Sequence, residues 1–264
     1  MGARCDVSPI KWFREMKSLL HKLSRKISRL WLRPIRIFVF HHVSDVRDPF
    51  VSALEDWTQT DVFYSNILSL RNKYKFISLG SAYKRIKSDR IRLGRYAVLT
   101  TDDGLRTVDK VWPWLERHSI PLTCFINAKY LDGHSYKVED VTRIKEVDPD
   151  ADIYQVIKRQ YMTREQLFSL VSPLISIASH GYEHLNARTL TEDQFKLNVL
   201  NCQEVLVSHP CYIPFFAYTW GKHNKDTDRV LFELGLTPVL VDGMKNYNDY
   251  IVLHRECIDG MIIK

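Results

Sequence analysis

Short apolar runs alternate with amphipathic segments along residues 35–258 of this sequence, and this alternation restricts the fold more than any other property. Short apolar runs are typical of buried β-strands, whereas a 3.6-residue apolar period is typical of helices. The predicted strands are IRIFVFHHV, YAVLTTDDG, LTCFINA, ISIASHG, FFAYTWG, TPVLVDG and YIVLHRECI, with FISLG as a short extended piece before a helix. The predicted helices cover residues 61–74, 81–86, 109–118, 163–171, 191–207 and 226–234. The pattern predicts parallel strands in one α/β sheet or barrel.

The length of the chain is sufficient for one large α/β domain. With 264 residues, 45% of them hydrophobic, the chain can bury a full core. We expect a folded domain over residues 35–264, preceded by an extension over residues 1–34. Residues 131–161 interrupt the alternation because they are polar and charged with a weak apolar pattern. We interpret them as an insertion or lid between two strands.

The positive charge of the chain is concentrated in the extension. The formal net charge is +7, but residues 1–36 hold ten Lys or Arg against two acidic residues, and the remainder holds 28 basic and 29 acidic residues. A nearly neutral body does not favour a polyanion, so no nucleic acid partner is expected. Apolar residues recur at helical spacing over residues 10–31, and Pro34 ends the pattern. This basic amphipathic helix would pack on the domain, contact a partner protein, or bind an anionic membrane surface through residues 10–33.

The cysteines and the hydropathy pattern bear on the location of the chain. Five scattered cysteines without a C-x-x-C pair favour a reducing compartment and argue against a thiolate zinc site. The sequence shows neither a secretory apolar region near its start nor an apolar run of the ~18 residues that span a membrane. We therefore expect a cytoplasmic chain, with the basic helix allowing a peripheral position on the inner membrane face.

Acidic and imidazole side chains follow two of the predicted strands. Asp102 and Asp103 end one strand, and adjacent side chains on a strand point to opposite faces unless the backbone turns, as Gly104 allows. Such a pair could also cap the following helix or lie solvated. His180 and His184 follow a later strand, and two imidazoles with one carboxylate form a ligand set for Zn²⁺ or a similar divalent ion.

Histidines also occur in the first predicted strand. His41 and His42 occupy opposite faces of the first predicted strand, where either a structural or a functional role is open. The spacing of the later pair differs from the H-E-x-x-H of zinc metallopeptidases, because Glu183 stands next to the second histidine rather than the first. A metallopeptidase is therefore disfavoured.

Five motifs, taken in order, resemble those of the polysaccharide deacetylase family, the carbohydrate esterases that remove N-acetyl groups from sugars. TTDDG is similar to the T-F-D-D-G motif, SHGYEH to H-[ST]-x-x-H, and FFAYTWGKHN to F-A-Y-P-Y-G. FVFHHVSD and VLHRECI resemble the Y-H-x-V and L-P-R-I motifs of the branch that deacetylates poly-N-acetylglucosamine. The resemblance covers roughly residues 35–258. The sequence departs from the family pattern at Thr101, Gly181, Thr219, Trp220 and His254.

The resemblance implies a fold, a cofactor and a set of site residues. The fold would be the distorted (β/α) barrel of that family, with the basic helix added at its N-terminus. The cofactor would be a divalent metal, with Zn²⁺ preferred over other divalent transition metals, held by Asp103, His180 and His184. Asp102 would be the general base and His41 the general acid, with His254 as a second candidate acid. The backbone N–H of Trp220 would stabilise the oxyanion, and Arg255 would orient the base or line the groove.

Together these residues support one leading hypothesis and one alternative. The leading hypothesis is a metal-dependent hydrolase that removes N-acetyl groups from an N-acetylhexosamine in a glycan or a lipid-linked glycan precursor. Amide hydrolysis needs a polarised carbonyl, a base for the attacking water and an acid for the departing amine, and residues for each role are present. The alternative is a catalytically silent glycan-binding domain at the membrane surface, which the metal content of the purified protein would distinguish.

Overall fold

The structure is a computed structural model that describes residues 34–54, 57–88, 94–133, 135–246 and 251–263. The basic helix predicted over residues 10–31 lies outside the described residues. Among the helices that are described, none has the length and the apolar content needed to cross a membrane.

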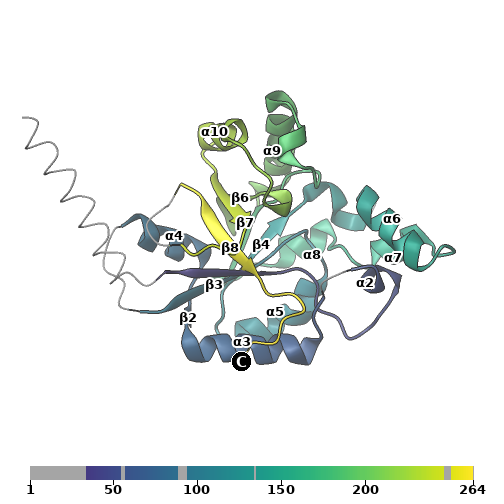
Figure 1. Ribbon diagram of the computed structural model, residues 1–264, viewed down its shortest axis with the longest axis horizontal. Coiled ribbons are helices and arrows are strands. Elements are labelled where there is room, and N and C mark those ends of the chain that lie inside the picture. Colours follow the sequence, from purple (N-terminus) through teal and green to yellow (C-terminus); the bar gives the residue numbers. More distant parts are fainter. Residues whose placement is uncertain (1–33, 55–56, 89–93, 134, 247–250, 264) are drawn as a thin grey trace, which may run out of the picture.

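Parallel strands lie at the centre of the described chain (Figure 1), and their pairing closes them into a ring. The ring follows the order β1 (Arg36–Phe40), β8 (Leu253–Cys257), β7 (Thr237–Val241), β6 (Tyr212–Ala217), β5 (Ile175–Ser179), β4 (Leu122–Ile126) and β3 (Tyr96–Thr101). The ring closes because β3 pairs with β1 as well as with β4. A short strand, β2 (Lys75–Phe76), pairs with the first residues of β3. The predicted (β/α) barrel is therefore confirmed.

Helices pack against the strands and loops of the barrel. They are α2 (Pro49–Ser52), α3 (Thr60–Lys73), α4 (Leu79–Lys87), α5 (Thr107–Arg117), α6 (Val138–Val147), α7 (Ile153–Lys158), α8 (Arg164–Ser169), α9 (Glu192–Leu206) and α10 (Lys225–Glu233). Thr163 and Thr191 cap α8 and α9, each in a capping box with the third residue of its helix. All six predicted helices are present. Helices α2, α6 and α7 were not predicted, and they gather on one side of the molecule (Figure 1).

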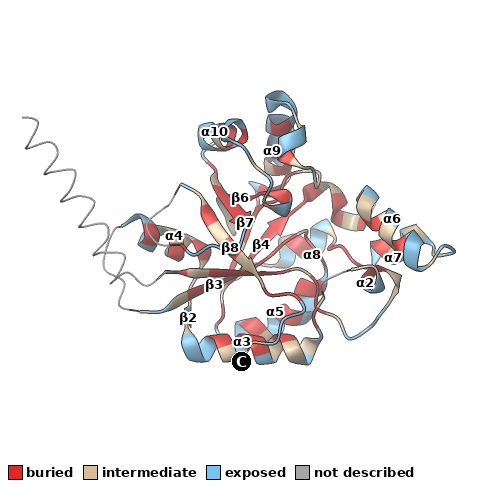
Figure 2. Cartoon of the chain, in the orientation of Figure 1, coloured by how far each residue is buried: buried red, intermediate tan, exposed pale blue. Residues whose placement is uncertain are grey.

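The core has an inner and an outer layer, which follow from the alternation of side chains along each strand. Inside the ring, one buried cluster contains Ile37, Val98, Phe125, Ala178, Ala217, Val239 and Leu253, together with residues of α4. A second buried cluster joins the outward-facing residues of the strands, such as Phe38 and Leu99, to α3 and α5. Figure 2 shows the strands as the mostly buried centre of the molecule.

Candidate active site

The inner face of the barrel continues into a cavity at the carboxyl ends of the strands. Because Ile37, Val98 and Ala178 face inward, the residues two or four positions later on the same face do so as well. These later residues include His41, Asp102 and His180, which line a cavity of about 250 Å³. The carboxyl ends of the strands are also where α/β barrels carry their active sites.

Asp103 reaches the same cavity because the backbone turns at this residue. Its φ is 73°, and that of Gly104 is 78°. A residue other than glycine is uncommon in this left-handed region, although Asp tolerates it better than most. In an extended strand Asp103 would point to the face opposite Asp102. The turn brings both carboxylates into one cavity, and it begins one residue earlier than the sequence suggested.

The three predicted metal ligands lie together. Asp103 Oδ1 is 3.6 Å from His180 Nε2 and 3.5 Å from His184 Nε2, and the three ligand atoms all lie within 4.8 Å of one another. These separations resemble the ~3.3 Å expected between ligand atoms around a tetrahedral ion with bonds of ~2.0 Å. Oδ1 is buried, and no described donor makes a hydrogen bond to it. The donor set therefore fits a divalent ion.

The two histidines are oriented by hydrogen bonds on their other ring nitrogens. Nδ1 of His180 lies 2.8 Å from the carbonyl oxygen of Ala217, and Nδ1 of His184 lies 2.8 Å from Glu139 Oε1. Since both partners are acceptors, each Nδ1 donates, and each Nε2 keeps its lone pair for a metal. Burial lowers the pKa of His180 to about 4, so this ring is neutral at neutral pH.

Asp102 is held by a buried arginine. The two outer nitrogens of Arg255 lie 2.6 Å from Asp102 Oδ1 and 2.7 Å from Oδ2, and the arginine is fully buried. Burial alone would raise the pKa of Asp102, but the charge of Arg255 and its hydrogen bonds to the carboxylate lower it below its ordinary value. Asp102 is therefore a carboxylate at neutral pH.

His41 faces Asp102 across the cavity and is paired with Asp259. Its Nε2 lies 3.9 Å from Asp102 Oδ2, and its Nδ1 lies 2.6 Å from Asp259 Oδ2. The backbone N–H of His41 also donates to Asp259. Burial acts to lower the pKa of His41, but the bond to Asp259 raises it well above its ordinary value. Asp259 was not predicted as a site residue, although an acidic residue directly after the last predicted strand was a usable signal.

Of Trp220 and His254, the two remaining predicted residues, only the first lines the cavity. Trp220 lines the cavity with its backbone in the left-handed region (φ 51°), and its indole packs edge-on to His184 with ring centroids 4.7 Å apart. His254 is not among the cavity-lining residues, because it sits on the outer face of β8 and pairs with Asp242 at 2.7 Å. The structure thus brings His41 to the proposed base, and places the second candidate acid elsewhere.

The loop that carries His180 and His184 explains one departure from the family motif. Gly181 has φ 87°, and a Cβ at this position would lie 2.7 Å from Asn198 Nδ2. The side-chain amide of Asn198 in turn binds the backbone of Glu183 twice: its Oδ1 accepts from the N–H at 2.7 Å, and its Nδ2 donates to the carbonyl oxygen at 3.2 Å. Asn198 of α9 thus fixes the loop, and the space that it takes favours glycine over Ser or Thr.

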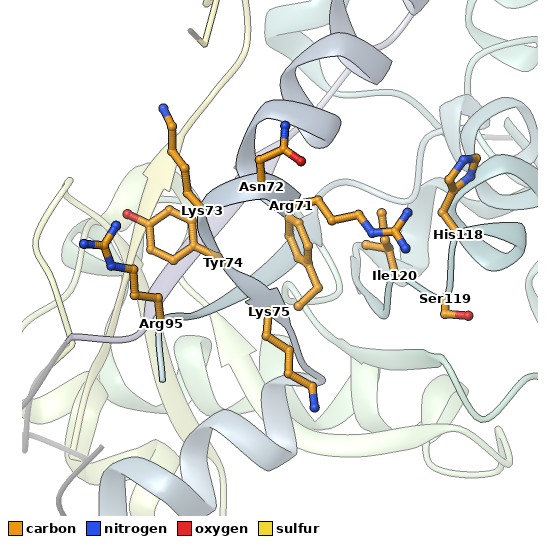
Figure 3. Close-up of a pocket in the computed structure, with 10 residues that line it drawn as sticks. Arg71, Asn72, Lys73, Tyr74, Lys75, Arg95, His118, Ser119 and Ile120 are labelled. Atoms are coloured by element: carbon orange, nitrogen blue, oxygen red, sulfur yellow. The ribbon is translucent and has the colours of Figure 1, made fainter. Parts of the chain in front are cut away.

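A second hollow lies at the opposite, amino-terminal end of the strands and has a volume of about 580 Å³ (Figure 3). Its cationic side chains come from the end of α3, from β2 and from the residue before β3. They are Arg71, Lys73, Lys75 and Arg95. None of the predicted site residues, all of which are described, lines this hollow.

Comparison with known protein families gives a match that covers the proposed metal ligands. The family described as polysaccharide deacetylase matches residues 90–239 of the chain. This segment contains β3 to β6 and every predicted metal ligand. No curated protein matches the sequence.

Solved structures show the same fold. Deacetylase PplD of Streptococcus pyogenes, in complex with acetate, is 16% identical, with 86% of this chain and 93% of that chain covered and a TM-score of 0.67. IcaB from Ammonifex degensii is 18% identical, with 85% and 91% covered and a TM-score of 0.67. The BpsB deacetylase domain from Bordetella bronchiseptica is 19% identical, with 84% and 95% covered and a TM-score of 0.63. At such identities the likeness establishes the fold alone.

Proposed function

Because the chain belongs to the polysaccharide deacetylase family, whose members are hydrolases acting on amide C–N bonds, we propose that it removes N-acetyl groups from an N-acetylhexosamine in a glycan or lipid-linked glycan precursor. One observation carries this proposal. Two carboxylates, two ligand-type histidines and a third histidine paired with Asp259 surround one cavity at the carboxyl end of the barrel.

The proposed cofactor is a divalent ion, with Zn²⁺ preferred, held by Asp103, His180 and His184. Neutral imidazole nitrogens and one carboxylate oxygen suit zinc and other divalent transition metals, and three protein ligands leave a position open for chemistry. When bound, such an ion polarises the acetyl carbonyl and makes the attacking water more acidic.

The side chains of this chain supply the proton transfers. Asp102, an anion held by Arg255, would accept a proton from the attacking water. His41, kept protonated by Asp259, would donate a proton to the amine nitrogen as the C–N bond breaks. The backbone N–H of Trp220 would donate to the carbonyl oxygen as it becomes negative. The products are acetate and the free amino sugar.

The silent glycan-binding domain is not favoured. A binding domain needs neither a buried Asp–Arg pair nor oriented ligand histidines, yet both are present. The departures from the family motifs leave every proposed ligand in place. Release of acetate from N-acetylhexosamine oligosaccharides, abolished by a chelator and restored by Zn²⁺, tests the proposal. Absence of acetate release from a broad panel of such sugars, with the metal bound, would refute it.

We also propose that the chain is cytoplasmic and peripheral on the inner membrane face, bound to anionic lipid through residues 10–33. This proposal rests on the basic amphipathic pattern of that segment. The segment joins the barrel just before β1, at the amino-terminal end of the strands, where the cationic hollow also lies.

A further inference from the structure

Lys137, in the insertion, places a positive charge beside the proposed metal ligands. Its Nζ lies 2.8 Å from Asp103 Oδ1, and its side chain is only 4% exposed. An ammonium group buried to this extent needs a compensating anion. Asp103 is that anion, and the pairing lowers the pKa of Asp103 despite the opposing effect of burial.

The Lys137 contact supplies charge without a directed hydrogen bond. Asp103 Oδ1 has no hydrogen-bond partner among the described residues, although Nζ is close. The same oxygen faces the Nε2 atoms of both ligand histidines at 3.5 and 3.6 Å. Asp103 therefore keeps a lone pair available for an ion while its charge is already neutralised by Lys137.

The insertion (residues 131–161) contacts His184 and the loop after Asp103, and these contacts fix the position of Lys137. Lys137 directly precedes α6, whose Glu139 binds His184. The end of the insertion is joined to the loop after Asp103 by two backbone bonds. These run from the N–H of Arg106 to the carbonyl of Gln160 at 2.7 Å, and from the N–H of Met162 to the carbonyl of Gly104 at 3.0 Å. The Asp103–Lys137 pair is thus held at both ends.

The net charge of the ligand set determines how strongly it attracts a cation. Asp102 is already compensated by Arg255, and the two imidazoles bring no negative charge. Asp103 is therefore the one directly ligating anion, and Lys137 cancels it. A divalent ion entering this set would meet an ammonium group a few ångströms away, which weakens its attraction to the site.

We propose that Lys137 competes electrostatically with the divalent ion for Asp103, so that it weakens metal affinity and keeps the ligand set paired when the ion is absent. The inference rests on the proposed function in taking Asp103, His180 and His184 as the ligands. Because coupling is reciprocal, a bound ion weakens the hold of Lys137 on Asp103 by the same factor. The insertion is then a regulator of metal occupancy as well as a wall of the cavity.

Measurement of Zn²⁺ dissociation constants by competition with a chromophoric chelator tests this inference. Lys137→Met should bind Zn²⁺ more tightly than the wild type, by roughly tenfold or more. Its metal-free form should melt at a lower temperature, because Asp103 loses its counter-charge, and Zn²⁺ should raise its melting temperature by more than in the wild type. Lys137→Gln, which keeps an N–H donor near Asp103, should bind more tightly as well and serves if the Met variant does not fold.

A matched control comes from the helix that follows Lys137. Arg143→Met removes a positive charge that lines the cavity, and it should leave the dissociation constant within about twofold of the wild type. Equal or weaker Zn²⁺ binding by the Lys137 variants would overturn the inference and leave the proposed function standing. If neither the wild type nor any variant binds Zn²⁺ or another divalent ion, both the inference and the proposed metal site fail.

Discussion

Arg255 donates to both carboxylate oxygens of Asp102, at 2.6 and 2.7 Å, although the two residues are 153 positions apart in the sequence. The pair is buried, and the arginine also reaches the hydroxyl of Thr100 at 3.2 Å. A planar guanidinium fixes the plane of the carboxylate as well as its charge. The proposed base is therefore held in one orientation on the inner face of the barrel.

Loss of Arg255 should destabilise the protein strongly. Arg255→Met leaves a buried carboxylate without its partner, which costs about 3–5 kcal/mol in the free energy of unfolding. Arg255→Lys keeps the charge and should lose less stability, but should lower kcat because the two-point contact is gone. Urea unfolding and acetate release measure the two effects. Arg229→Met, in an exposed ion pair with Glu192, is the control and should unfold like the wild type; an equal loss there would contradict the explanation.

The two adjacent aspartates should fail in different ways. Asp103→Asn should abolish retention of the metal, because the ligand set loses its carboxylate. Asp102→Asn should retain the metal and lose turnover, typically 10²–10⁴-fold for removal of a general base. Metal analysis of the purified variants, together with acetate release, separates the two roles. Full activity of either variant would refute the role assigned to that residue.

Asp259 should set the alkaline limb of the pH profile. Since its bond to His41 raises the pKa of that histidine, Asp259→Asn should lower it. The proton needed by the leaving amine is then lost at a lower pH, so the alkaline limb of kcat/KM should move toward acid. The same pair stabilises the fold below the ordinary histidine pKa of about 6.5, and this contribution disappears as pH rises through the raised value. An unchanged alkaline limb would show that another group titrates there.

Glu139 should strengthen metal binding, whereas Lys137 should weaken it. Glu139→Gln weakens the acceptor that orients His184, and loss of such a partner typically costs 10- to 100-fold in metal affinity. Glu183→Gln is a matched control, because Glu183 adjoins His184 in sequence but pairs with Lys129 at 3.0 Å. The Zn²⁺ dissociation constants of the two variants decide the matter. Similar affinities would remove Glu139 from the metal site.

Truncation should test the membrane proposal. A chain that begins at Ile35 should no longer float with anionic liposomes, whereas the full chain should float with anionic and not with neutral ones. Charge reversal at Lys75, in the cationic hollow, should weaken flotation less than truncation does. Flotation of the shortened chain at the level of the full chain would refute a lipid-binding role for residues 10–33.

The parts of the fold that could be predicted are those whose signal is local. Each strand of the ring is a short apolar run, and its inner and outer faces follow from alternation alone, so the positions of Asp102, His41 and His180 at the strand ends could be anticipated. Helices such as α5 and α9 bury apolar residues at three- and four-residue spacing, a pattern that a single segment reveals. Capping residues such as Thr163 and Thr191 marked two helix starts directly.

The parts that were missed depend on contacts between distant segments. Helices α6 and α7 pack with α2 in a small cluster of their own, built from Phe50, Val51, Leu105, Tyr130, Ile144, Ile157 and Tyr161. Helices α2 and α7 have only four and six residues, and α6 is rich in charged residues, so their few apolar residues form a weak pattern in the sequence. The partners Lys137 and Glu139 belong to this region, and Asp259 meets His41 across 218 positions. A charged residue in a polar stretch of sequence resembles a solvated surface residue, because its buried partner lies in a distant segment.

Strand β8 comes late in the sequence, after all the proposed metal ligands, and it carries or precedes the partners of the proposed base and acid. Because β8 lies between β1 and β7, the ring closes only after the last strand has been synthesised. Asp103, His180 and His184 all precede this strand, whereas Arg255 lies on it and Asp259 follows it. A nascent chain therefore carries its complete ligand set before the proposed base and acid have acquired their partners. The residues that hold the proposed base and acid are thus synthesised after those that would hold the metal.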